Sequence, residues 1–142
     1  MKIALRCAWI AFAVITTSAL YARPATPQQA GWLGMGVTYH QTDGRPWLLV
    51  AGLEPGGPAE RAGLRVQDVI VAIDGRAISF PNELHAMAFF LDVTPRRTLR
   101  FTVARQNRKI VVSVTAVPLP SRHHERWKAR ADFVRKRLEK KN

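Results

Sequence analysis

Residues 54–75 read EPGGPAERAGLRVQDVIVAIDG, and the fold can be worked out from this stretch. Pro58 suits the first position of a helix and Gly63 suits the left-handed residue that ends one, so a helix of about two turns or fewer is predicted between them. Residues 68–73 (DVIVAI) are expected to form an apolar strand, because a short apolar run between turn signals is typical of a strand. The Asp74-Gly75 pair then closes that strand with a tight turn.

More strands are predicted on both sides of this stretch. Residues 35–40 follow a glycine-rich turn and are interpreted as a short strand, and residues 47–53 (WLLVAGL) have the composition of a buried strand. Residues 98–104 and 109–117 alternate apolar and polar side chains on either side of the polar segment 105–108. That arrangement predicts a hairpin.

A second helix is expected from Pro81 to Leu91. His85 and Phe89 share one face of it. Another face carries apolar residues at three- and four-residue spacing: Leu84, Met87, Ala88 and Leu91. The predicted fold is therefore α+β and mainly β, a small, partly open β-barrel of five to six strands capped by two helices.

The beginning of the chain has the layout of a secretory signal peptide. Lys2 and Arg6 precede the apolar run 7–20 (CAWIAFAVITTSAL), and small residues follow it. A membrane-spanning helix needs about 17–25 apolar residues, so residues 1–22 are predicted to be a cleaved signal, with an uncleaved N-terminal anchor as the alternative. The protein is expected to be exported, either periplasmic or secreted, and membrane-anchored if the segment stays. Residues 23–30 (RPATPQQA) lack periodicity and are interpreted as a linker.

The charge balance is strongly basic, because 22 Lys and Arg against 10 Asp and Glu give a net charge of +12. Such an excess favours anionic partners. Residues 121–142 carry half of this excess and contain apolar side chains at helical spacing, so they are predicted to form a basic amphipathic helix. The apolar side chains are Trp127, Ala131, Val134 and Leu138.

Two alternatives are open for the basic tail. It docks its apolar stripe on the body of the protein and leaves its charges in water, or it lies on an anionic membrane surface or on an acidic protein. Nucleic acid is not an expected partner, because an exported protein rarely meets any.

The sequence contains no recognisable catalytic motif. No serine lies in a Gly-x-Ser-x-Gly elbow, and His124-Glu125 is not followed by the second histidine of a zinc-binding helix. Asp68 and Asp74 flank an apolar strand, where aspartate commonly fixes turns, so both are interpreted as structural. The protein is predicted not to be an enzyme and to need no metal or cofactor.

Residues 31–37 (GWLGMGV) are the main candidate for a binding site. Glycine lets the backbone adopt conformations closed to other residues, and successive free N–H groups can then converge on one anion. An apolar strand leaves directly from this turn, and an exposed strand edge beside such a nest can bind a chain terminus by strand addition. The alternative is an ordinary turn before a strand.

The order of these motifs resembles a bacterial PDZ domain. The residues that carry the resemblance are the Trp32-Leu33-Gly34-Met35 loop, the stretch 54–75, and the helix and hairpin that follow. The resemblance covers residues 31–118 and is strongest to the PDZ domains of HtrA-type periplasmic serine proteases. It predicts a PDZ domain over residues 31–120, here without a preceding protease domain.

The resemblance also implies how a peptide would bind. The loop N–H groups would hold the C-terminal carboxylate of a partner, and the peptide would pair with residues 35–38 and lie against the second helix. His85 and Phe89 would line the groove, and the last apolar side chain would enter a pocket beside the loop. The residues expected to contact a peptide are Leu33, Gly34, Met35, Gly36, Val37, His85 and Phe89.

Alternatives stay open for these residues. His85 faces solvent or the groove, Phe89 packs in the core or lines the groove, and a slip of one residue in the helix register would exchange Phe89 with Phe90. The loop departs from the family pattern, in which an Arg or Lys often precedes it, because residues 28–31 read QQAG. Residues 28–31 therefore contain no cation that could support a bound carboxylate.

Together these patterns predict a non-enzymatic adaptor of the cell envelope that recognises protein C-termini or extended segments. The alternative is a detached regulatory or substrate-delivery partner of a periplasmic protease. In a third interpretation the protein acts at a membrane surface and its groove is vestigial.

Overall fold

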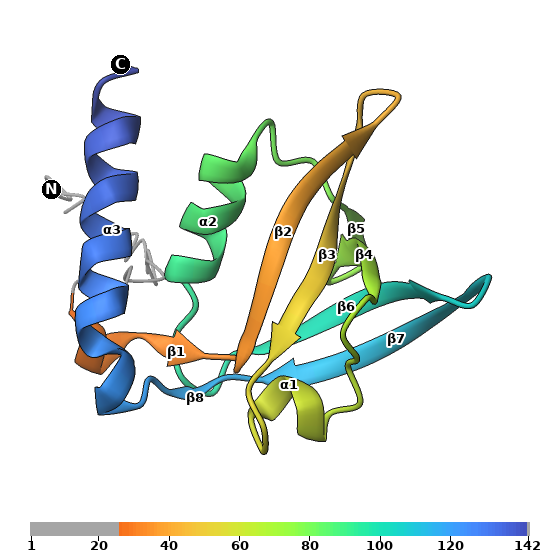
Figure 1. The fold of residues 1–142 in the computed structure, drawn as a ribbon, viewed down its shortest axis with the longest axis horizontal. Coiled ribbons are helices and arrows are strands. Elements are labelled where there is room, and N and C mark those ends of the chain that lie inside the picture. The colour runs from red at the N-terminus through yellow and green to blue at the C-terminus, as the bar shows by residue number, and fades with distance from the viewer. Residues whose placement is uncertain (1–25, 142) are drawn as a thin grey trace, which may run out of the picture.

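A six-stranded antiparallel sheet forms the body of the protein in the computed structural model, which describes residues 26–141 (Figure 1). Five strands follow the order β2-β3-β4-β6-β7, and β5 pairs with β4 off this path. The sheet is open, so β2 and β7 are its edges. Its strands are β2 (Met35–Thr42), β3 (Arg45–Leu53), β4 (Val69–Ile73), β5 (Arg76–Ala77), β6 (Thr98–Arg105) and β7 (Arg108–Thr115).

Three helices and one small ladder complete the described part of the chain. The ladder joins two short strands that are far apart in the sequence, β1 (Gly31–Trp32) and β8 (Val117–Pro118). The helices are α1 (Pro58–Arg61), α2 (Glu83–Leu91) and α3 (His124–Glu139), with 3-10 turns at η1 (Pro27–Gln29) and η2 (Ser121–His123). The predicted α+β class with five to six strands is confirmed, and the six-stranded sheet is not closed into a barrel.

The signals between residues 54 and 75 produce the expected elements. Pro58 takes the first helical position of α1, and Gly63, with φ of 101°, follows it in a left-handed conformation that favours glycine. β4 (Val69–Ile73) is the predicted apolar strand, with Ile70 and Ile73 buried. The predicted hairpin of β6 and β7 turns at Gln106 and Asn107, whose φ values of 49° and 60° are typical of the tight turn that matches strand twist.

β2 and β3 form a longer hairpin than the sequence interpretation expected. The strands predicted at 35–40 and 47–53 continue to Thr42 and begin at Arg45. Asp43-Gly44 joins them with φ values of 50° and 72°. This dipeptide is a strong signal for such a turn, so the sequence did contain the information.

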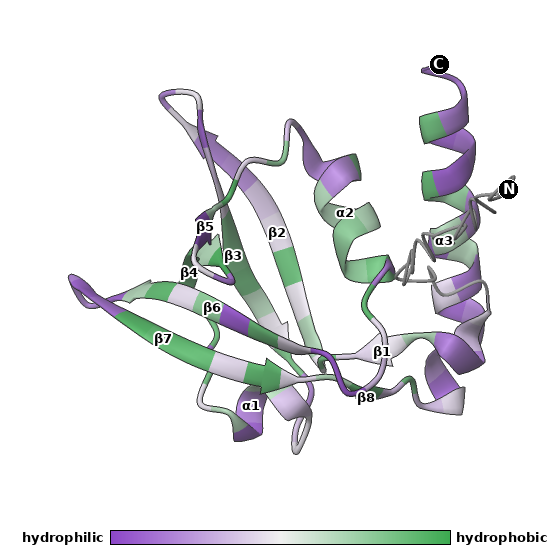
Figure 2. Cartoon of the chain, turned by 180° about the vertical axis from the view of Figure 1, so that it is seen from behind, coloured by the Kyte–Doolittle hydropathy of each residue, from purple (hydrophilic) through white to green (hydrophobic). Residues whose placement is uncertain are grey.

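The hydrophobic core lies between the sheet and helices α1 and α2. Figure 2 shows hydrophobic residues concentrated on α2 and along the strands, whereas α3 is mostly hydrophilic. The largest fully buried side chains are Phe101, Leu48, Ile70, Leu99, Val50, Val93, Val103 and Val114. This core fixes the relative positions of β2 and α2, which border the candidate site.

α3 docks on the body beside α2 (Figure 1). Val134 of the predicted apolar stripe is only 4% exposed. The remaining residues of the stripe are half-buried: Trp127, Ala131 and Leu138. Pairing of β8 with β1 ties the start of the tail to the body, and the Leu119 N–H donates to the Ala30 oxygen at 3.0 Å. Of the two alternatives for the tail, the structure has the docked one.

The predicted signal peptide, residues 1–22, lies outside the described residues, as do the first three residues of the predicted linker 23–30. The end of that linker is packed rather than free, since Pro27–Gln29 forms η1 and Ala30 is fully buried. Within residues 26–141 no helix is both long and apolar enough to cross a membrane.

Candidate functional site

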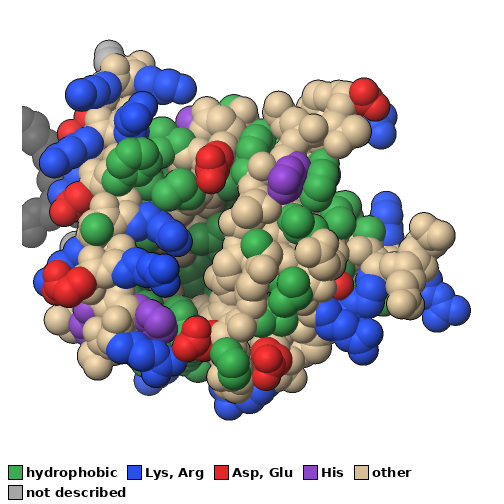
Figure 3. All heavy atoms as spheres, in the orientation of Figure 1, with side chains coloured by type: hydrophobic (Ala, Val, Ile, Leu, Met, Phe, Trp, Pro, Cys, Tyr) green, Lys and Arg blue, Asp and Glu red, His purple; other side chains and the backbone are tan. Residues whose placement is uncertain are grey.

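A hollow of about 530 Å³ lies between β2, α2 and α3. Its volume falls in the range of about 300–1,000 Å³ that is usual for ligand sites. Figure 3 shows it as a depression with apolar side chains at its bottom, between the Lys and Arg side chains of α3 and the backbone of β2. Residues 31–37 line one end of it.

The loop before β2 is held to the body by its carbonyl groups. The Leu33 oxygen accepts a hydrogen bond from the Ala59 N–H at 2.9 Å, and the Gly34 oxygen accepts one from the Glu54 N–H at 2.8 Å. The C=O and N–H of one trans peptide unit point in opposite directions. The N–H groups of the next residues in the loop, Gly34 and Met35, therefore face away from α1 and β3.

These N–H groups are unused within the described part of the chain. No described residue accepts a hydrogen bond from the N–H of Leu33 or Gly34. Met35 pairs with Leu53, and the bond from Glu54 to Gly34 beside that pair makes it a pair without direct hydrogen bonds. The Met35 N–H thus points to the open edge of the sheet. The N–H groups of Gly34 and Met35 are therefore available at the hollow, and the N–H of Leu33 has no acceptor among the described residues.

Gly34 makes this loop conformation accessible. Its φ is +70°, and a Cβ there would lie 3.1 Å from Cδ of Pro58 and 3.2 Å from Cα of Gly57. A side chain would therefore be strained both by the backbone conformation and by close contact. The loop can approach α1 only because residue 34 has no side chain.

β2 presents an unpaired edge along the hollow. It is the outer strand of the sheet, and its register with β3 shifts between Gly36 and Val37. Such a bulge increases local twist. The Tyr39 hydroxyl donates to the Phe80 oxygen at 2.8 Å and so holds the segment before α2 against β2.

α2 turns a different face to the hollow from the one that the resemblance implied. The helix begins after Asn82, whose Oδ1 accepts from the His85 N–H at 3.2 Å and lies 2.9 Å from His85 Nδ1. Phe89 packs on Phe80 and Phe90 with ring centroids 5.3 and 5.2 Å apart. The residues of α2 that line the hollow are Glu83, Ala86, Met87, Phe90 and Leu91.

His85 and Phe89 do not line this hollow, whereas Phe90 does, and a contact of His85 or Phe89 with a peptide stays a prediction. The reason is that α2 is apolar on most of its faces, so periodicity alone does not choose the inward one. Leu33, Gly34, Met35, Gly36 and Val37 all line the hollow, as expected. Peptide binding by these residues stays a prediction.

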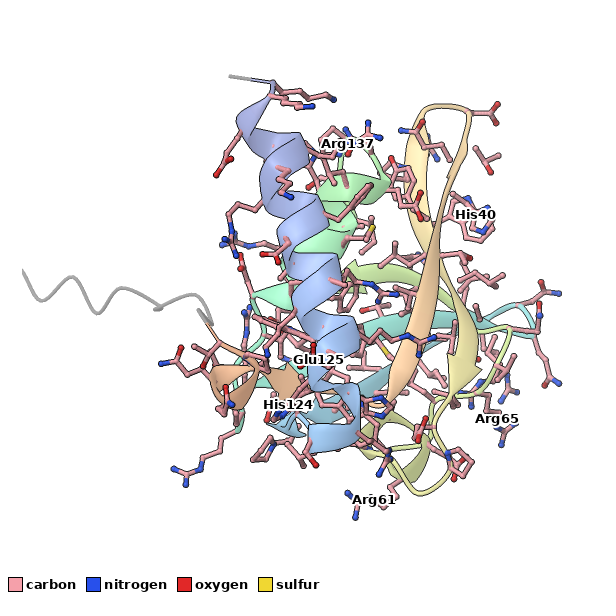
Figure 4. All side chains as sticks on the ribbon, turned by 60° about the vertical axis from the view of Figure 1, so that its left-hand side comes forward. His40, Arg61, Arg65, His124, Glu125 and Arg137 are labelled. Carbon is pink, nitrogen blue, oxygen red and sulfur yellow. The ribbon has the colours of Figure 1, made fainter. Side chains whose placement is uncertain are left out.

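Sequence reasoning missed the third wall of the hollow. His123, Arg126, Trp127 and Arg130 line it from η2 and α3. Their spacing of three and four residues was a visible signal, because it marks one face of a helix. Figure 4 shows this helix from outside, with His124 and Glu125 in its first turn and Arg137 near its far end.

The start of α3 is fixed over Trp32 of the loop. The rings of His123 and Trp32 lie 5.6 Å apart, and the Arg122 guanidinium lies 5.8 Å from the Trp32 ring centroid. Arg122 also donates to the Glu54 carboxylate at 2.9 Å. Nε2 of His123 is buried, has no hydrogen-bond partner in the described structure and lies 4.0 Å from Oε1 of Glu54.

The two aspartates set aside as structural have structural contacts. Asp68 accepts from the Arg65 N–H at 2.8 Å and from two nitrogens of Arg105 at 2.8 and 2.7 Å. Burial by itself raises the pKa of Asp68, but these hydrogen bonds and the charge of Arg105 outweigh it, so the pKa lies below its usual value. Asp74 accepts from the Arg100 N–H at 2.8 Å. Residues 26–141 hold no cluster of three or more potential metal ligands.

Three features occur together in this structure. The antiparallel sheet is open, its edge strand β2 and helix α2 border a groove, and a glycine loop with free N–H groups lies at one end of that groove. Together they define a PDZ-type interaction module. The PDZ domain family model matches residues 49–105. The chain thus contains a PDZ domain, and this domain is similar to those of the HtrA and DegP proteases.

Three similar proteins illustrate the relationship. A "Probable periplasmic serine endoprotease DegP-like" of Brucella suis biovar 1 (strain 1330) is 27% identical over 101 residues, which cover 66% of this chain and 19% of the relative. The "Na(+)/H(+) exchange regulatory cofactor NHE-RF1" of Gallus gallus is 42% identical over 45 residues, covering 32% of this chain and 14% of the relative. The solved structure "HtrA-type protease AlgW with decapeptide" is 25% identical and superposes with a TM-score of 0.53. The matched region covers 65% of this chain and 30% of the chain in that structure.

The chain spans about a fifth of the DegP-like relative that it matches. The similarity therefore concerns the PDZ module, which is a protein-interaction module. The proteolytic activity of the relatives is not transferred with it.

Proposed function

We propose that this protein is a non-enzymatic adaptor that binds protein C-termini or extended peptide segments in the hollow between β2 and α2. The observation that carries the proposal is the run of three free N–H groups at residues 33–35, placed where the unpaired edge of β2 begins. A carboxylate accepts several hydrogen bonds at once, and hydrogen bonds to a charged group are the stronger kind.

The rest of the hollow can hold the peptide residues that precede such a carboxylate. An extended peptide that ends at the loop would run antiparallel to β2 and add a strand to the sheet. Its last side chain would meet the apolar lining formed by Leu33, Met35, Phe90 and Leu91. An affinity on the order of micromolar is expected, because a short peptide loses much entropy when it is ordered.

The test compares two matched pools of fluorescent decapeptides that end in an apolar residue, one with a free C-terminal carboxylate and one amidated. We expect the free-acid pool to bind the purified protein about tenfold more tightly, since amidation removes the charged acceptor. Equal binding of both pools, or no binding of either, would contradict the proposal. Anisotropy titration measures both affinities in the same buffer.

We further infer that the protein works in the periplasm. The layout of residues 1–22 and the similarity to a periplasmic DegP-like protease support this location. Cell fractionation with N-terminal sequencing tests the export.

The alternative role is delivery of substrates to a separate periplasmic protease, and it rests on the occurrence of this module in proteases. This role predicts that adding the protein changes the cleavage rate of a purified HtrA-type protease. An unchanged cleavage rate would contradict it.

A second function is proposed for the outer face of α3, namely attachment to an anionic membrane surface. Phe133 is 49% exposed there, with the Arg137 guanidinium 5.3 Å from its ring centroid. Because docking uses the apolar stripe of α3, this attachment would be mainly electrostatic, worth about 1 kcal/mol per basic residue at the surface. An acidic protein is the alternative partner.

Vesicles distinguish this second function. The protein should sediment with phosphatidylglycerol vesicles at low salt and leave them near 1 M salt, where the screening length falls to about 3 Å. Neutral phosphatidylcholine vesicles serve as the control. Binding that does not depend on salt, or no binding at low salt, would count against the proposal.

A further inference from the structure

Two arginines without ion-pair partners line the hollow from α3. Arg126 and Arg130 are one helical turn apart, and both contribute to the same hollow as the loop of residues 33–35. Neither forms a salt bridge within residues 26–141, whereas Arg122, Lys128 and Arg135 pair with Glu54, Glu125 and Asp132. Within the described residues, the charges of Arg126 and Arg130 at the hollow are therefore not neutralised by an ion pair.

The acidic side chains of the hollow do not cancel this charge at the loop end. Glu54 is bonded to Arg122 at 2.9 Å. Glu83 is the first residue of α2, while the far end of that helix is tied to the loop by a 2.7 Å bond from the Gly31 N–H to the Val93 oxygen. At a rise of 1.5 Å per residue, Glu83 lies about 12 Å from the end of α2 that meets the loop.

α3 runs along the groove from its loop end. Its first turn follows His123, which stacks on Trp32 of the loop, and α3 and β2 lead from there toward the same end of the molecule (Figure 1). Arg126 is therefore the nearer of the two arginines to the N–H groups of the loop. Arg130 lies about 6 Å further along, close to the spacing of about 7 Å between alternate residues of an extended peptide.

We propose that Arg126 and Arg130 make this groove selective for acidic C-termini, meaning chains that end in a free carboxylate and carry Asp or Glu among the residues just before it. This inference rests on the peptide-binding function proposed above. Arg126 supplies the cation that residues 26–32 lack, since they contain no Lys or Arg. Arg130 attracts an acidic side chain upstream of the carboxylate. α3 then forms the side of the groove that selects acidic peptides.

The helix that carries Arg126 and Arg130 is fixed by contacts of other residues, so these two side chains stay free of contacts that hold the helix. Burial of Val134 and the contacts of Arg122 and His123 at Trp32 fix the helix, while Arg126 and Arg130 themselves remain exposed. Exposed charge pairs are weak, so a preference of about fivefold is expected rather than an absolute requirement. The preference should shrink as salt is added.

The experiment uses pools of free-acid decapeptides with mixed apolar last residues, in which the four preceding positions are Glu in one pool and Gln in the other. The wild-type protein should bind the Glu pool about fivefold more tightly. Arg126→Gln/Arg130→Gln should lose that preference and still bind the Gln pool, and Arg126→Lys/Arg130→Lys should keep most of it. The matched control is Lys136→Gln/Lys140→Gln, which removes the same charge from the last turn of α3 and from the residue that caps it, outside the hollow, and should leave the preference unchanged.

The outcomes separate this inference from the function on which it rests. A free-acid pool that binds better than its amide, with no difference between Glu and Gln, overturns the acidic preference alone. An equal loss of preference in the control variant overturns the role of Arg126 and Arg130 and assigns the effect to overall charge. If no pool binds at all, both proposals fail. Thermal unfolding of each variant confirms that it is folded.

Discussion

Gly34 places the loop N–H groups where a carboxylate can reach them. Its positive φ and its contact with Gly57 and Pro58 turn the carbonyl groups of the loop into the body and leave the N–H groups outside. Gly44 has nearly the same φ, +72°, but no atom lies within 4 Å of where its Cβ would be. A side chain at either glycine would therefore be strained by the backbone conformation, but only a side chain at residue 34 would also be strained by close contact.

We predict that Gly34→Ala destabilises the protein more than Gly44→Ala. The left-handed conformation costs each substitution about 1–2 kcal/mol, and the close contact adds about 1 kcal/mol or more at residue 34 only. Urea unfolding of both variants measures the difference. Equal losses would mean that the loop relaxes away from α1 without cost.

Asp68 is the buried acidic residue of the described chain, at 2% exposure. Its hydrogen bonds to Arg105 join the turn before β4 to the end of β6. Since its pKa is lower in the folded protein than in the unfolded chain, the carboxylate stabilises the fold above the unfolded pKa. That contribution is lost as the pH falls through the folded pKa.

Asp68→Asn should therefore cost about 1–3 kcal/mol at pH 7 and progressively less as the pH falls below about 4. Free energies of unfolding for wild type and variant between pH 7 and pH 3 give the comparison. Arg105→Gln is the companion variant, because it removes the other half of the pair. A cost that stays constant over this pH range would contradict the ionic role.

Among the elements, the register of α2 decides which of its aromatic side chains lines the hollow. Phe90 lines the hollow, while Phe89 packs against Phe80 and lies under Arg97, whose guanidinium is 5.6 Å from its ring centroid. Both are half-buried. Adjacent residues of the same type thus have different roles, and a pair of substitutions can tell them apart.

Phe90→Ala should weaken binding of the free-acid peptide pool by about tenfold, because it removes apolar area worth about 25 cal/mol per Å² from the groove. Phe89→Ala should change peptide affinity little, although both variants lose stability. Peptide titration below the unfolding temperature of each variant separates the two effects. A larger loss of affinity in Phe89→Ala would restore the register implied by the resemblance.

At the scale of the whole molecule, the docking of α3 converts a PDZ groove with two walls into one with three. β8 pairs with β1, which brings the tail next to the loop, and the apolar stripe holds the rest of α3 on the body. Half of the net charge of +12 is thereby placed along one side of the molecule. Neighbouring residues Phe133 and Val134 report on this docking, since they are 49% and 4% exposed.

Val134→Ala should lower the free energy of unfolding by about 1–2 kcal/mol, since it removes buried methyl groups. Phe133→Ala removes a larger side chain but should stay within about 0.5 kcal/mol, as surface substitutions usually do. Chemical unfolding followed by circular dichroism measures both. A greater loss in Phe133→Ala would show that the opposite face of α3 is the docked one.

Much of the fold was predictable because its signals are local. Pro58, Gly63 and Asp74-Gly75 act through backbone conformation within a few residues, so α1 and β4 followed directly. The loop of residues 31–37 was recognisable for the same reason. The register of α2 was not, because a helix that is apolar on most faces has no single inward side until a sheet is placed against it.

The PDZ domain and the loop of Leu33, Gly34 and Met35 thus followed from short-range backbone preferences and apolar periodicity. The place of Phe90 at the hollow came only with the packing of α2 against the sheet. Arg126 and Arg130 reach the hollow because distant segments meet, above all through the pairing of Gly31 and Trp32 with Val117 and Pro118. No local preference encodes such a pairing.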